Sequence, residues 1–425
     1  MLEAYLQRVV DVGDLTVAVG AGRPRTYGDG SGRPIAIRMK PGSGVKLAMN
    51  PELKLGECFM DGELVFEQGD MFDLLELVAN NPRFWKKPRT AALRMRETAL
   101  RRLQQINDRR AARRNVAHHY DLSHELYARF LDADMQYSCA YFTAPGDTLE
   151  QAQAAKKAHI AAKLNLPQGG RLLDIGCGWG GLGLTLAHMA PELEVTGVTL
   201  SREQHAVAER RAQAQGVSGR VDFQLRDYRD VRGPFDRIVS VGMFEHVGQP
   251  RFQEFFDTCG RLLADDGVML LHAIGRHTPP GRTQPFIAKY IFPGGYIPSL
   301  SEVLPMIEEA GLWVTDLEVL RLHYAETLRE WRRRFQAQRA EITALYDERF
   351  CRMWEFYLIS SEAGFRWFGM MNFQIQLAKR VDALPITRDY MFADEQRLAQ
   401  GGTTAPTRGG RPQASMRLLS HAAWR

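Results

Sequence analysis

The sequence predicts an α/β protein in which a doubly wound, mostly parallel sheet of seven strands follows a smaller α+β unit. Two observations predict the sheet. A glycine cluster joins an apolar run to a helical pattern at residues 171–189, and strand-length apolar runs then alternate with amphipathic stretches. A third observation predicts the smaller unit, because residues 1–80 hold short alternating runs separated by glycine-rich turns.

Length and composition limit the class of protein. The 425 residues are enough for two or three domains, and 45% apolar with 25% charged residues is typical of a soluble globular protein. No apolar run approaches the ~18 residues of a spanning helix, and the N-terminus lacks the apolar core of a secretory signal. Five scattered cysteines without a CxxC pair predict a reducing cytoplasm, no disulfide framework and no metal site.

The positive charge of the chain is concentrated in one segment. Residues 83–114 hold twelve Lys or Arg and two acids, a net charge of +10, so the remainder of a chain of net charge +5 carries −5. Apolar residues recur among the arginines, which indicates a helix. Three interpretations stay open: a solvated or dimer-contact helix, a surface for anionic lipid headgroups at ~1 kcal/mol per cation, and a nucleic-acid surface, which the lack of a recognised module argues against.

Residues 1–81 are expected to form the smaller domain. Strands are predicted at residues 15–19, 35–39 and 64–66, and an amphipathic helix at residues 71–78 after Asp70. No cluster of His, Asp or Ser suggests chemistry, so a scaffold and a lipid-binding module are both open. A basic helical linker over residues 82–115 is expected to follow.

Two patterns precede the sheet. Aromatic and leucine residues from Tyr120 to Phe130 fall at helical spacing, and residues 136–142 have the sequence QYSCAYF, which is aromatic, polar and expected to be a loop. Taken alone, Cys139 is most simply a core cysteine. A helix over residues 149–164 then leads to the first strand.

Polar residues follow five predicted strands. The strands lie at residues 172–175, 194–198, 221–225, 235–241 and 267–271, with helices at residues 182–189, 202–215 and 251–263. Ligands of such sheets lie outside the carboxyl ends of the strands. That rule brings five residues to one edge: Gly176, Thr199, Asp227, Glu245 and His272. No helix or strand pattern requires this mixture there, so they are candidate site residues.

The turn after the first strand has the spacing G-x-G-x-G, formed by Gly176, Gly178 and Gly180, and Asp174 lies two residues before it. Glycines let a ligand approach the main chain, and the amides at the start of the next helix suit a polar ligand. Dinucleotide folds share such turns. The acid and the spacing favour S-adenosylmethionine, with its methionyl end and ribose in the loop, over a nicotinamide cofactor.

The C-terminal part is expected to complete the sheet. Residues 276–300, rich in Pro, Gly and aromatics, are expected to be a lid over the site. A helix at 304–311, a sixth strand at 313–320, a long helical stretch at 324–360 and a strand at 373–377 that closes the sheet are predicted to follow. The Gly-, Pro- and Thr-rich tail, residues 396–425, is expected to be disordered.

Taken together, the motifs resemble the cyclopropane-fatty-acyl-phospholipid synthases and the related mycolic acid cyclopropane synthases. The resemblance spans residues 116–380 and is carried, in the family's order, by HHYDLSHELYARFL, MQYSCAYF, LLDIGCGWGG, GVTLSREQ, RDYRD, GMFEHVG, LHAIG and KYIFPGGYIPS. It implies a class I methyltransferase fold for a catalytic domain at residues 116–395. The first 80 residues resemble the small sterol-carrier-like, lipid-handling domain of the two-domain members.

The resemblance implies an enzyme that transfers methylene from S-adenosylmethionine to a cis double bond of an unsaturated phospholipid chain. It places the cofactor against residues of the five strand ends and the QYSCAYF loop: Tyr137, Ser138, Asp174, Gly176, Gly178, Gly180, Thr199, Leu200, Ser201, Gln204, Asp227 and Tyr228. Most methyltransferases end the second strand with an acid that holds the ribose. Thr199 and its neighbours take this position here, in agreement with the family.

The resemblance also implies a bound bicarbonate as the base, held by Cys139, Glu245, His272, Ile274 and Tyr324. Aromatic faces can stabilise the carbocation that develops by ~0.5–2 kcal/mol each, and the candidates are Tyr137, Phe244, Tyr290 and Tyr324. Water must be excluded because it would trap the cation as an alcohol. A cytoplasmic homodimer, peripheral on the inner face of the membrane, is expected.

One position departs from the family. Members often carry a cysteine in the C-terminal helix, where YLISSEAGF has Ser361 and Cys351 is out of register. Direct transfer to the alkene needs no thiol, so a cyclopropane synthase is the favoured hypothesis. Three alternatives stay open: a C-methyltransferase giving methyl-branched or methylene chains, a lipid-binding protein with a vestigial cofactor fold, and a methyltransferase of small molecules or nucleic acid.

Overall fold

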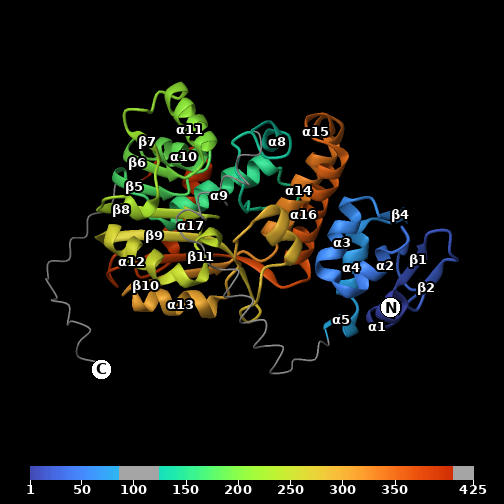
Figure 1. The fold of residues 1–425 in the computed structure, drawn as a ribbon. Helices are drawn as coiled ribbons and strands as arrows, with labels where there is room; N and C mark the ends of the chain where they lie inside the picture. Colours follow the sequence, from blue (N-terminus) through green and yellow to red (C-terminus); the bar gives the residue numbers. More distant parts are fainter. Residues whose placement is uncertain (86–123, 405–425) are drawn as a thin grey trace, which may run out of the picture.

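The computed structural model describes residues 1–85 and 124–404 (Figure 1). Two sheets organise them, a four-stranded sheet near the N-terminus and a seven-stranded sheet in the larger part. In Figure 1 the helices of residues 323–366 stand between the two parts. Of the expected basic linker, only the short helix α5 (Pro82–Trp85) falls within the described residues.

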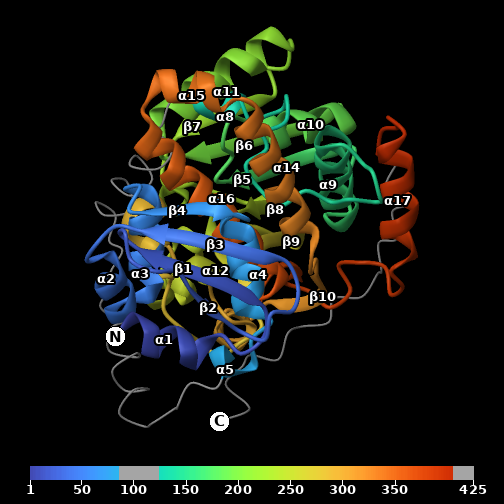
Figure 2. The same ribbon diagram turned by 90° about the vertical axis from the view of Figure 1, so that its right-hand side faces the viewer.

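The N-terminal sheet has the strand order β2-β1-β3-β4 (Figure 2). Its elements are α1 (Leu2–Val9), β1 (Asp14–Val19), β2 (Arg25–Tyr27), β3 (Pro34–Met39), α2 (Ser43–Met49), α3 (Pro51–Met60), β4 (Leu64–Gln68) and α4 (Met71–Ala79). The three predicted strands are present as β1, β3 and β4. The predicted helix is α4, and it begins after Asp70, whose carboxylate accepts a hydrogen bond from the Asp73 amide. Strand β2 and the helices α1 to α3 have no counterpart among the elements predicted from the sequence.

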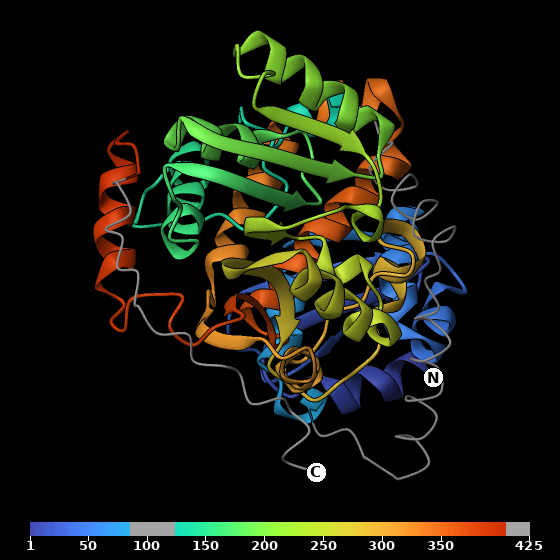
Figure 3. The ribbon, with the colours of Figure 1, turned by 90° about the vertical axis from the view of Figure 1, so that its left-hand side faces the viewer.

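The larger sheet has the strand order β10-β11-β9-β8-β5-β6-β7 (Figure 3). Its strands are β5 (Gly169–Ile175), β6 (Glu192–Thr199), β7 (Val221–Leu225), β8 (Phe235–Val241), β9 (Leu263–Arg276), β10 (Trp313–Val319) and β11 (Met370–Ala378). The first five pair in parallel, and β11 is antiparallel to both β9 and β10. The prediction of a mostly parallel, doubly wound sheet is confirmed. However, β11 lies between β9 and β10 and does not close the edge.

Helices cover both faces of this sheet. The helices of the larger part are α8 (His124–Ala128), α9 (Leu149–Lys163), α10 (Gly181–Met189), α11 (Arg202–Ala214), α12 (Phe252–Leu262), α13 (Leu300–Glu309), α14 (His323–Ala337), α15 (Arg339–Leu345), α16 (Glu348–Arg366) and α17 (Asp389–Ala399). The long helical stretch predicted at 324–360 is therefore three helices, α14 to α16. Helix α17 extends past the expected start of the disordered tail, and residues 405–425 lie outside the described residues.

A shared hydrophobic core joins the two parts of the molecule. Phe286, together with Phe356 and Ile359 of α16, packs among the buried residues of the N-terminal sheet and helices. Gly56 of α3 permits this approach, because a Cβ there would lie 2.4 Å from the Phe286 ring and 2.6 Å from the Phe356 ring. Within the two described ranges, no helix combines the length and the apolar character needed to cross a membrane.

Part of the segment 276–300, which was expected to be a lid over the site, lies against helix α3 of the N-terminal part. Arg282 forms a 2.5 Å ion pair with Glu52 of α3, and Lys289 forms a 2.7 Å ion pair with Glu57 of the same helix. This segment therefore docks the N-terminal part against the larger part. The second half of the segment approaches the residues that follow β8, where the Phe292 ring lies 5.9 Å from the ring of His246.

Candidate active site

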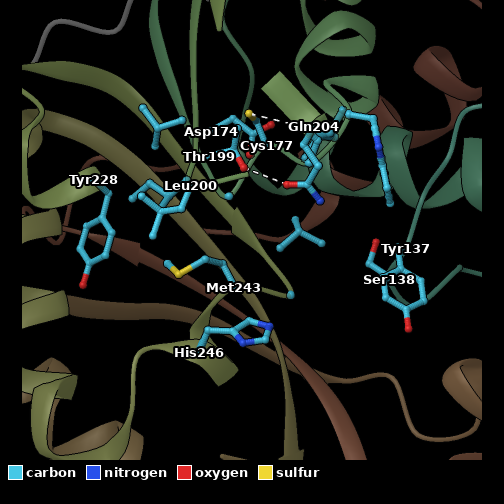
Figure 4. Close-up of a pocket in the computed structure, with 18 of the residues that line it drawn as sticks. Tyr137, Ser138, Asp174, Cys177, Thr199, Leu200, Gln204, Tyr228, Met243 and His246 are labelled. Atoms are coloured by element: carbon cyan, nitrogen blue, oxygen red, sulfur yellow. Dashed lines mark hydrogen bonds between the residues drawn. The ribbon is translucent and has the colours of Figure 1, made fainter. Parts of the chain in front are cut away.

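A cavity lies at the carboxyl edge of the larger sheet, around the glycine turn (Figure 4). Its empty volume is about 1230 Å³, part of it open to solvent. Most of the cofactor-binding residues predicted from the sequence line it: Tyr137, Ser138, Asp174, Gly176, Gly178, Thr199, Leu200, Gln204, Asp227 and Tyr228. The sheet order changes direction at β5, and such a switch point is where open α/β sheets bind ligands.

Gly180 and Ser201 are outside this lining and have structural functions. A Cβ on Gly180 would lie 2.7 Å from the Phe223 ring, so this glycine lets α10 pack closely on the sheet. Ser201 caps α11, where its hydroxyl accepts a hydrogen bond from the Gln204 amide at 3.3 Å. It therefore acts on the cavity through the position of Gln204.

The glycine turn leaves room for a ligand at Gly178. Its φ is +54°, and a Cβ added there would meet no atom of the described residues within 4 Å. At Gly176, with φ of +86°, a Cβ would lie 2.8 Å from the side chain of Met243. The turn thus needs glycine at Gly176 for packing and backbone conformation, and at Gly178 it exposes the main chain to the cavity.

Asp174 supplies a buried acceptor at the end of β5. Its Oδ2 atom has no hydrogen-bond partner within the described residues, and burial raises the pKa of the carboxyl to about 7. A buried polar atom without a partner is unfavourable, so a ligand that brings an ammonium or hydroxyl group to this oxygen is stabilised. The methionyl amine and ribose hydroxyls of S-adenosylmethionine are such groups.

Two further polar pairs are preorganised on this side of the cavity. Thr199 Oγ1 donates to Gln204 Oε1 at 2.8 Å, and both side chains are buried (Figure 4). Arg229 donates hydrogen bonds to both carboxylate oxygens of Asp227, from Nε to Oδ1 at 2.9 Å and from Nη2 to Oδ2 at 2.6 Å. The polar wall is therefore set by the protein before a ligand arrives.

An aromatic wall faces these pairs. Figure 4 shows Tyr137 and Ser138 across the cavity from Thr199 and Gln204. The Tyr137 hydroxyl lies 2.7 Å from that of Tyr357 on α16, and its ring lies 5.1 Å from the Trp331 ring on α14. Helices α14 and α16, which lie between β10 and β11 in sequence, thus support this side of the cavity.

His246 lines the cavity and was missed as a site residue. It follows β8 in the motif GMFEHVG, and only Glu245 of that motif was singled out from the sequence. Burial lowers the pKa of His246 to about 4, so the ring is neutral at pH 7. The carboxyl-end rule applied to the whole motif would have found both His246 and Met243, which lie together in Figure 4.

The residues predicted to hold the base lie behind the cavity lining. They are Cys139, Glu245, His272, Ile274 and Tyr324. One direct contact joins two of them, a hydrogen bond of 2.5 Å from the Ile274 amide to Glu245 Oε1. The other oxygen, Oε2, is buried with no partner within the described residues, and burial raises the pKa of Glu245 to about 7.

His272 is placed differently from the expectation. β9 continues to Arg276, so His272 lies inside the strand and not at its end. Its two ring nitrogens lie 2.8 Å from the amide of Asn372 and 3.0 Å from that of Gln374, both on β11. Both contacts are with amide nitrogens, and a neutral imidazole accepts at only one ring nitrogen, so one of the two contacts is a hydrogen bond and side chains of β11 border both nitrogens. Burial lowers the pKa of His272 well below its usual value.

Cys139 and Tyr324 are interior residues. Cys139 is fully buried, and its thiol donates to the carbonyl of Ala140 at 3.3 Å. Burial raises the pKa of this thiol, which keeps it protonated. The Tyr324 ring lies 5.9 Å from the Trp331 ring, which also contacts the cavity residue Tyr137.

Two aromatic candidates are away from the cavity. Phe244 is fully buried in the core, with its ring 4.4 Å from that of Phe252, so its predicted contact with a cation is wrong. Tyr290 donates its hydroxyl to Glu57 at 2.9 Å, at the junction with the N-terminal part. Tyr137 and its neighbour Tyr324 are the candidates nearest to the glycine turn's cavity.

Comparisons with known proteins agree with this geometry. Residues 107–375 match the family model described as mycolic acid cyclopropane synthetase. The probable fatty acid methyltransferase of Pseudomonas putida is 38% identical over 352 residues, which cover 80% of this chain and 86% of that protein. The cyclopropane-fatty-acyl-phospholipid synthase of Escherichia coli K12 is 38% identical over 350 residues, which cover 82% and 89%.

A solved relative has a related structure. The crystal structure of the mycolic acid cyclopropane synthase CmaA1, complexed with SAH and CTAB, is 35% identical to this chain with a TM-score of 0.60. The likeness covers 62% of this chain and 97% of that chain.

Proposed function

Because this chain belongs to the mycolic acid cyclopropane synthetase family and is an S-adenosylmethionine-dependent methyltransferase, we propose that it converts the cis double bond of unsaturated phospholipid chains into a cyclopropane ring. One observation carries the proposal. The cavity around the glycine turn is bordered by His246, and the preceding residue, Glu245, is a buried carboxyl whose pKa burial raises to about 7.

The residues around the cavity suit each requirement of the reaction. The alkene is a weak nucleophile that attacks the sulfonium methyl group, so donor and alkene must be held in line. Asp174 and the Gly178 main chain are proposed to hold the donor. The wall of Tyr137, with Tyr324 behind it, is proposed to face the carbocation that develops and to exclude water.

The ring closes only when a proton leaves the transferred methyl group. Glu245 is proposed to take part in the transfer of this proton, because a carboxyl with a pKa of about 7 exchanges a proton readily near neutral pH. Its Oε1 atom is fixed by the Ile274 amide, so Oε2 is the oxygen that is able to accept or donate.

We propose that bicarbonate binds beside Glu245, but that His272 is not one of the residues that hold it. When ionised, Oε2 of Glu245 can accept the hydroxyl hydrogen of bicarbonate, with Cys139, Ile274 and Tyr324 around it, whereas both ring nitrogens of His272 lie against side-chain amides of β11. When bound, bicarbonate supplies a base for the methyl proton. Glu245 is thus proposed to hold the ion, and His272 to support the strand behind it.

Labelled cofactor tests the reaction. The full chain is incubated with vesicles of monounsaturated phospholipid and S-adenosylmethionine carrying a trideuterated methyl group. A cyclopropane product shows ring protons by NMR, and mass spectrometry shows that one deuterium has been lost in forming the methylene bridge. No transfer to lipid, with transfer to another acceptor, would refute the proposal.

A C-methyltransferase of the same lipids is the second candidate. The relative from Pseudomonas putida is named a probable fatty acid methyltransferase, and Ser361 stands where family members often carry cysteine. If the proton leaves from the chain, the product is a methyl-branched olefin that retains all three deuterium atoms. A methylene product loses one deuterium from the methyl group, as the cyclopropane does, but it lacks the ring protons in the NMR spectrum, so the same experiment separates the candidates.

The proposal includes the setting in which the enzyme works. We propose an N-terminal lipid-handling domain, a cytoplasmic homodimer, and contact with anionic lipid through residues 83–114. Arg83, at the start of that segment, forms a 2.7 Å ion pair with Asp11 and so joins it to the N-terminal part. Binding of the chain to anionic vesicles should weaken as salt rises, because surface charges are screened. Binding that is insensitive to salt favours a dimer contact.

A further inference from the structure

Lys156 is a buried cation behind the wall of the cavity. It lies on α9 and is 1% exposed. Its Nζ atom donates to Gln136 Oε1 at 2.7 Å and to Ser138 Oγ at 2.8 Å, and both partners line the cavity. Burial of an ammonium group is unfavourable unless it is paired, so a purely apolar residue would be the simpler solution for packing here.

The lysine fixes the direction of the Ser138 hydrogen bond. An ammonium group only donates, so Ser138 Oγ accepts from Lys156 and keeps its own hydrogen for another acceptor. Gln136 is oriented in the same way, because its Oε1 atom accepts from Lys156 while its Nε2 atom donates to Asp134 at 3.0 Å. Lys156 therefore makes Ser138 a hydrogen-bond donor toward the contents of the cavity.

Several charged or titratable groups face Lys156. They are Asp132 and Asp134 of the preceding loop, Lys157 of α9, Cys139, Asp174 of β5 and His272 of β9. Asp134 is already paired with Lys157 at 2.6 Å and with Arg211. Burial lowers the pKa of Lys156 to about 8, so the group is mostly charged at pH 7 and loses its charge within a range that binding experiments reach.

We propose that Lys156 is a positioning residue for the cofactor. Lys156 orients the Ser138 hydroxyl, and adds its positive charge behind it, toward the carboxylate at the methionyl end of the cofactor. This inference rests on the proposed function, because it takes the cavity as the site of S-adenosylmethionine. A carboxylate is both an anion and an acceptor, so it matches a hydroxyl donor with an ammonium group behind it.

Two ligands test the assignment. The probes are S-adenosylhomocysteine and its decarboxylated form, which differ only in the carboxylate, and their binding to the full chain is measured by calorimetry. Lys156→Met should weaken S-adenosylhomocysteine by about tenfold or more, as expected for a lost hydrogen bond to a charged group. The same variant should bind the decarboxylated ligand within about twofold of the wild type, because that ligand lacks the group in question.

Gln153 offers a matched control on the same helix. Its Nε2 atom donates to the backbone oxygens of Gln136 at 3.2 Å and of Ser138 at 3.0 Å, so it clamps the same loop without a charge. Gln153→Leu should change the affinity of both ligands by the same factor. Equal losses for both ligands in Lys156→Met, or a carboxylate-selective loss in Gln153→Leu, would overturn the proposal.

A pH series on the wild-type chain needs no variant. The affinity for S-adenosylhomocysteine should fall as pH rises through about 8 and Lys156 loses its proton, measured below the pKa of the ligand's own amine and relative to the decarboxylated ligand. Parallel pH profiles for the two ligands would overturn the proposal. Failure of the wild-type chain to bind either ligand would instead refute the proposed function, and the inference with it.

Discussion

Asp174 and Glu245 are two buried carboxyl groups whose pKa values are raised by burial to about 7. Each has one oxygen without a hydrogen-bond partner within residues 1–85 and 124–404. Such an oxygen costs about 1–3 kcal/mol when it stays unpaired, so both sites gain from a ligand. Asp174 lines the cavity and Glu245 lies behind it, so we propose that Asp174 binds the cofactor and that Glu245 takes part in proton transfer.

Glu245→Gln tests this division. The amide keeps the shape of the side chain but does not accept the proton, so kcat on vesicles should fall by at least about 100-fold, the lower range for general acid–base groups. Affinity for S-adenosylhomocysteine should stay unchanged in calorimetry. In the wild type, activity should rise with pH through about 7, because the ionised carboxylate is the form that accepts a proton. Equal turnover of the variant and the wild type would remove Glu245 from the mechanism.

Gly178 and Gly216 form a matched pair for testing the glycine turn. Both have positive φ, +54° and +68°, and at neither would a Cβ meet a described atom within 4 Å. Alanine at either position should therefore lower the free energy of unfolding by a similar amount, about 1–2 kcal/mol. Only Gly178→Ala should also weaken S-adenosylhomocysteine in calorimetry, because only Gly178 borders the cavity. A similar loss of affinity in Gly216→Ala would mean that strain alone explains the effect.

The residues of the site differ in how well the sequence predicts them. Thr199 and Asp227 stand at the ends of predicted strands, so the carboxyl-end rule places them at the cavity, where the structure has them. The rule fails at His272, because β9 runs five residues further than the predicted strand at 267–271 and the histidine is paired inside the sheet. The role of Lys156 could not be predicted from the sequence, because it depends on the contacts that the loop of Gln136 and Ser138 makes with α9 in the fold.

At the scale of elements, a buried ionic cluster fastens α17 to α9. His159 Nε2 lies 2.9 Å from Glu318 of β10, and its Nδ1 lies 3.1 Å from Glu395 of α17. The ring of His159 stacks on Tyr141 at 4.2 Å, in the loop that carries Tyr137. The C-terminal helix and the loop of the cavity therefore share one histidine.

Glu395→Gln should weaken this cluster in a pH-dependent way. Burial opposes the charge of His159, but its hydrogen bonds with Glu318 and Glu395 prevail and raise its pKa above 6.5. Stability from the charged pair is therefore fully present below pH 6.5 and is lost as pH rises through the raised pKa. The variant should lose about 1–2 kcal/mol at pH 6 and almost nothing at pH 9, by calorimetric unfolding.

Asp394 provides the control for that measurement. It is the preceding residue of α17 and pairs with Arg397, whose charge does not titrate in this range. Asp394→Asn should therefore change stability by the same small amount at both pH values. A loss in Glu395→Gln that is equal at pH 6 and pH 9 would show that His159 does not carry the charge.

Elements with a clear apolar period were predicted well, and those defined by packing were not. Strands β7 and β8 have the predicted bounds because their apolar runs end at polar turns. The stretch at 324–360 gives one continuous helical pattern, yet breaks near Gln338 and Tyr346 divide it into three helices. The segment at 276–300 has a composition typical of a lid, but Phe286 and Lys289 bind the N-terminal part, which no local pattern reveals.

At the scale of the whole molecule, α16 connects the N-terminal core to the cavity. Phe356 packs in the N-terminal core, and the next residue, Tyr357, bonds to the cavity residue Tyr137 through their hydroxyls. A shift of α16 therefore moves both contacts. Glu57 adds a charged junction at the same place, where burial is outweighed by hydrogen bonds from Lys289, Lys54 and Tyr290 that lower its pKa to about 2.

Gly56→Ala tests whether this connection affects the cofactor site. The added methyl group would overlap the rings of Phe286 and Phe356, so the variant should lose about 1–3 kcal/mol of stability by forcing the helices apart. Because Tyr357 moves with Phe356, affinity for S-adenosylhomocysteine should also fall, by about two- to tenfold for a coupling of this kind. Gly44→Ala is the control, since a Cβ there meets only the flexible Leu2 side chain, 2.8 Å away within the N-terminal part. If Gly56→Ala lowers stability but leaves calorimetric affinity unchanged, the two parts share a core without sharing the site.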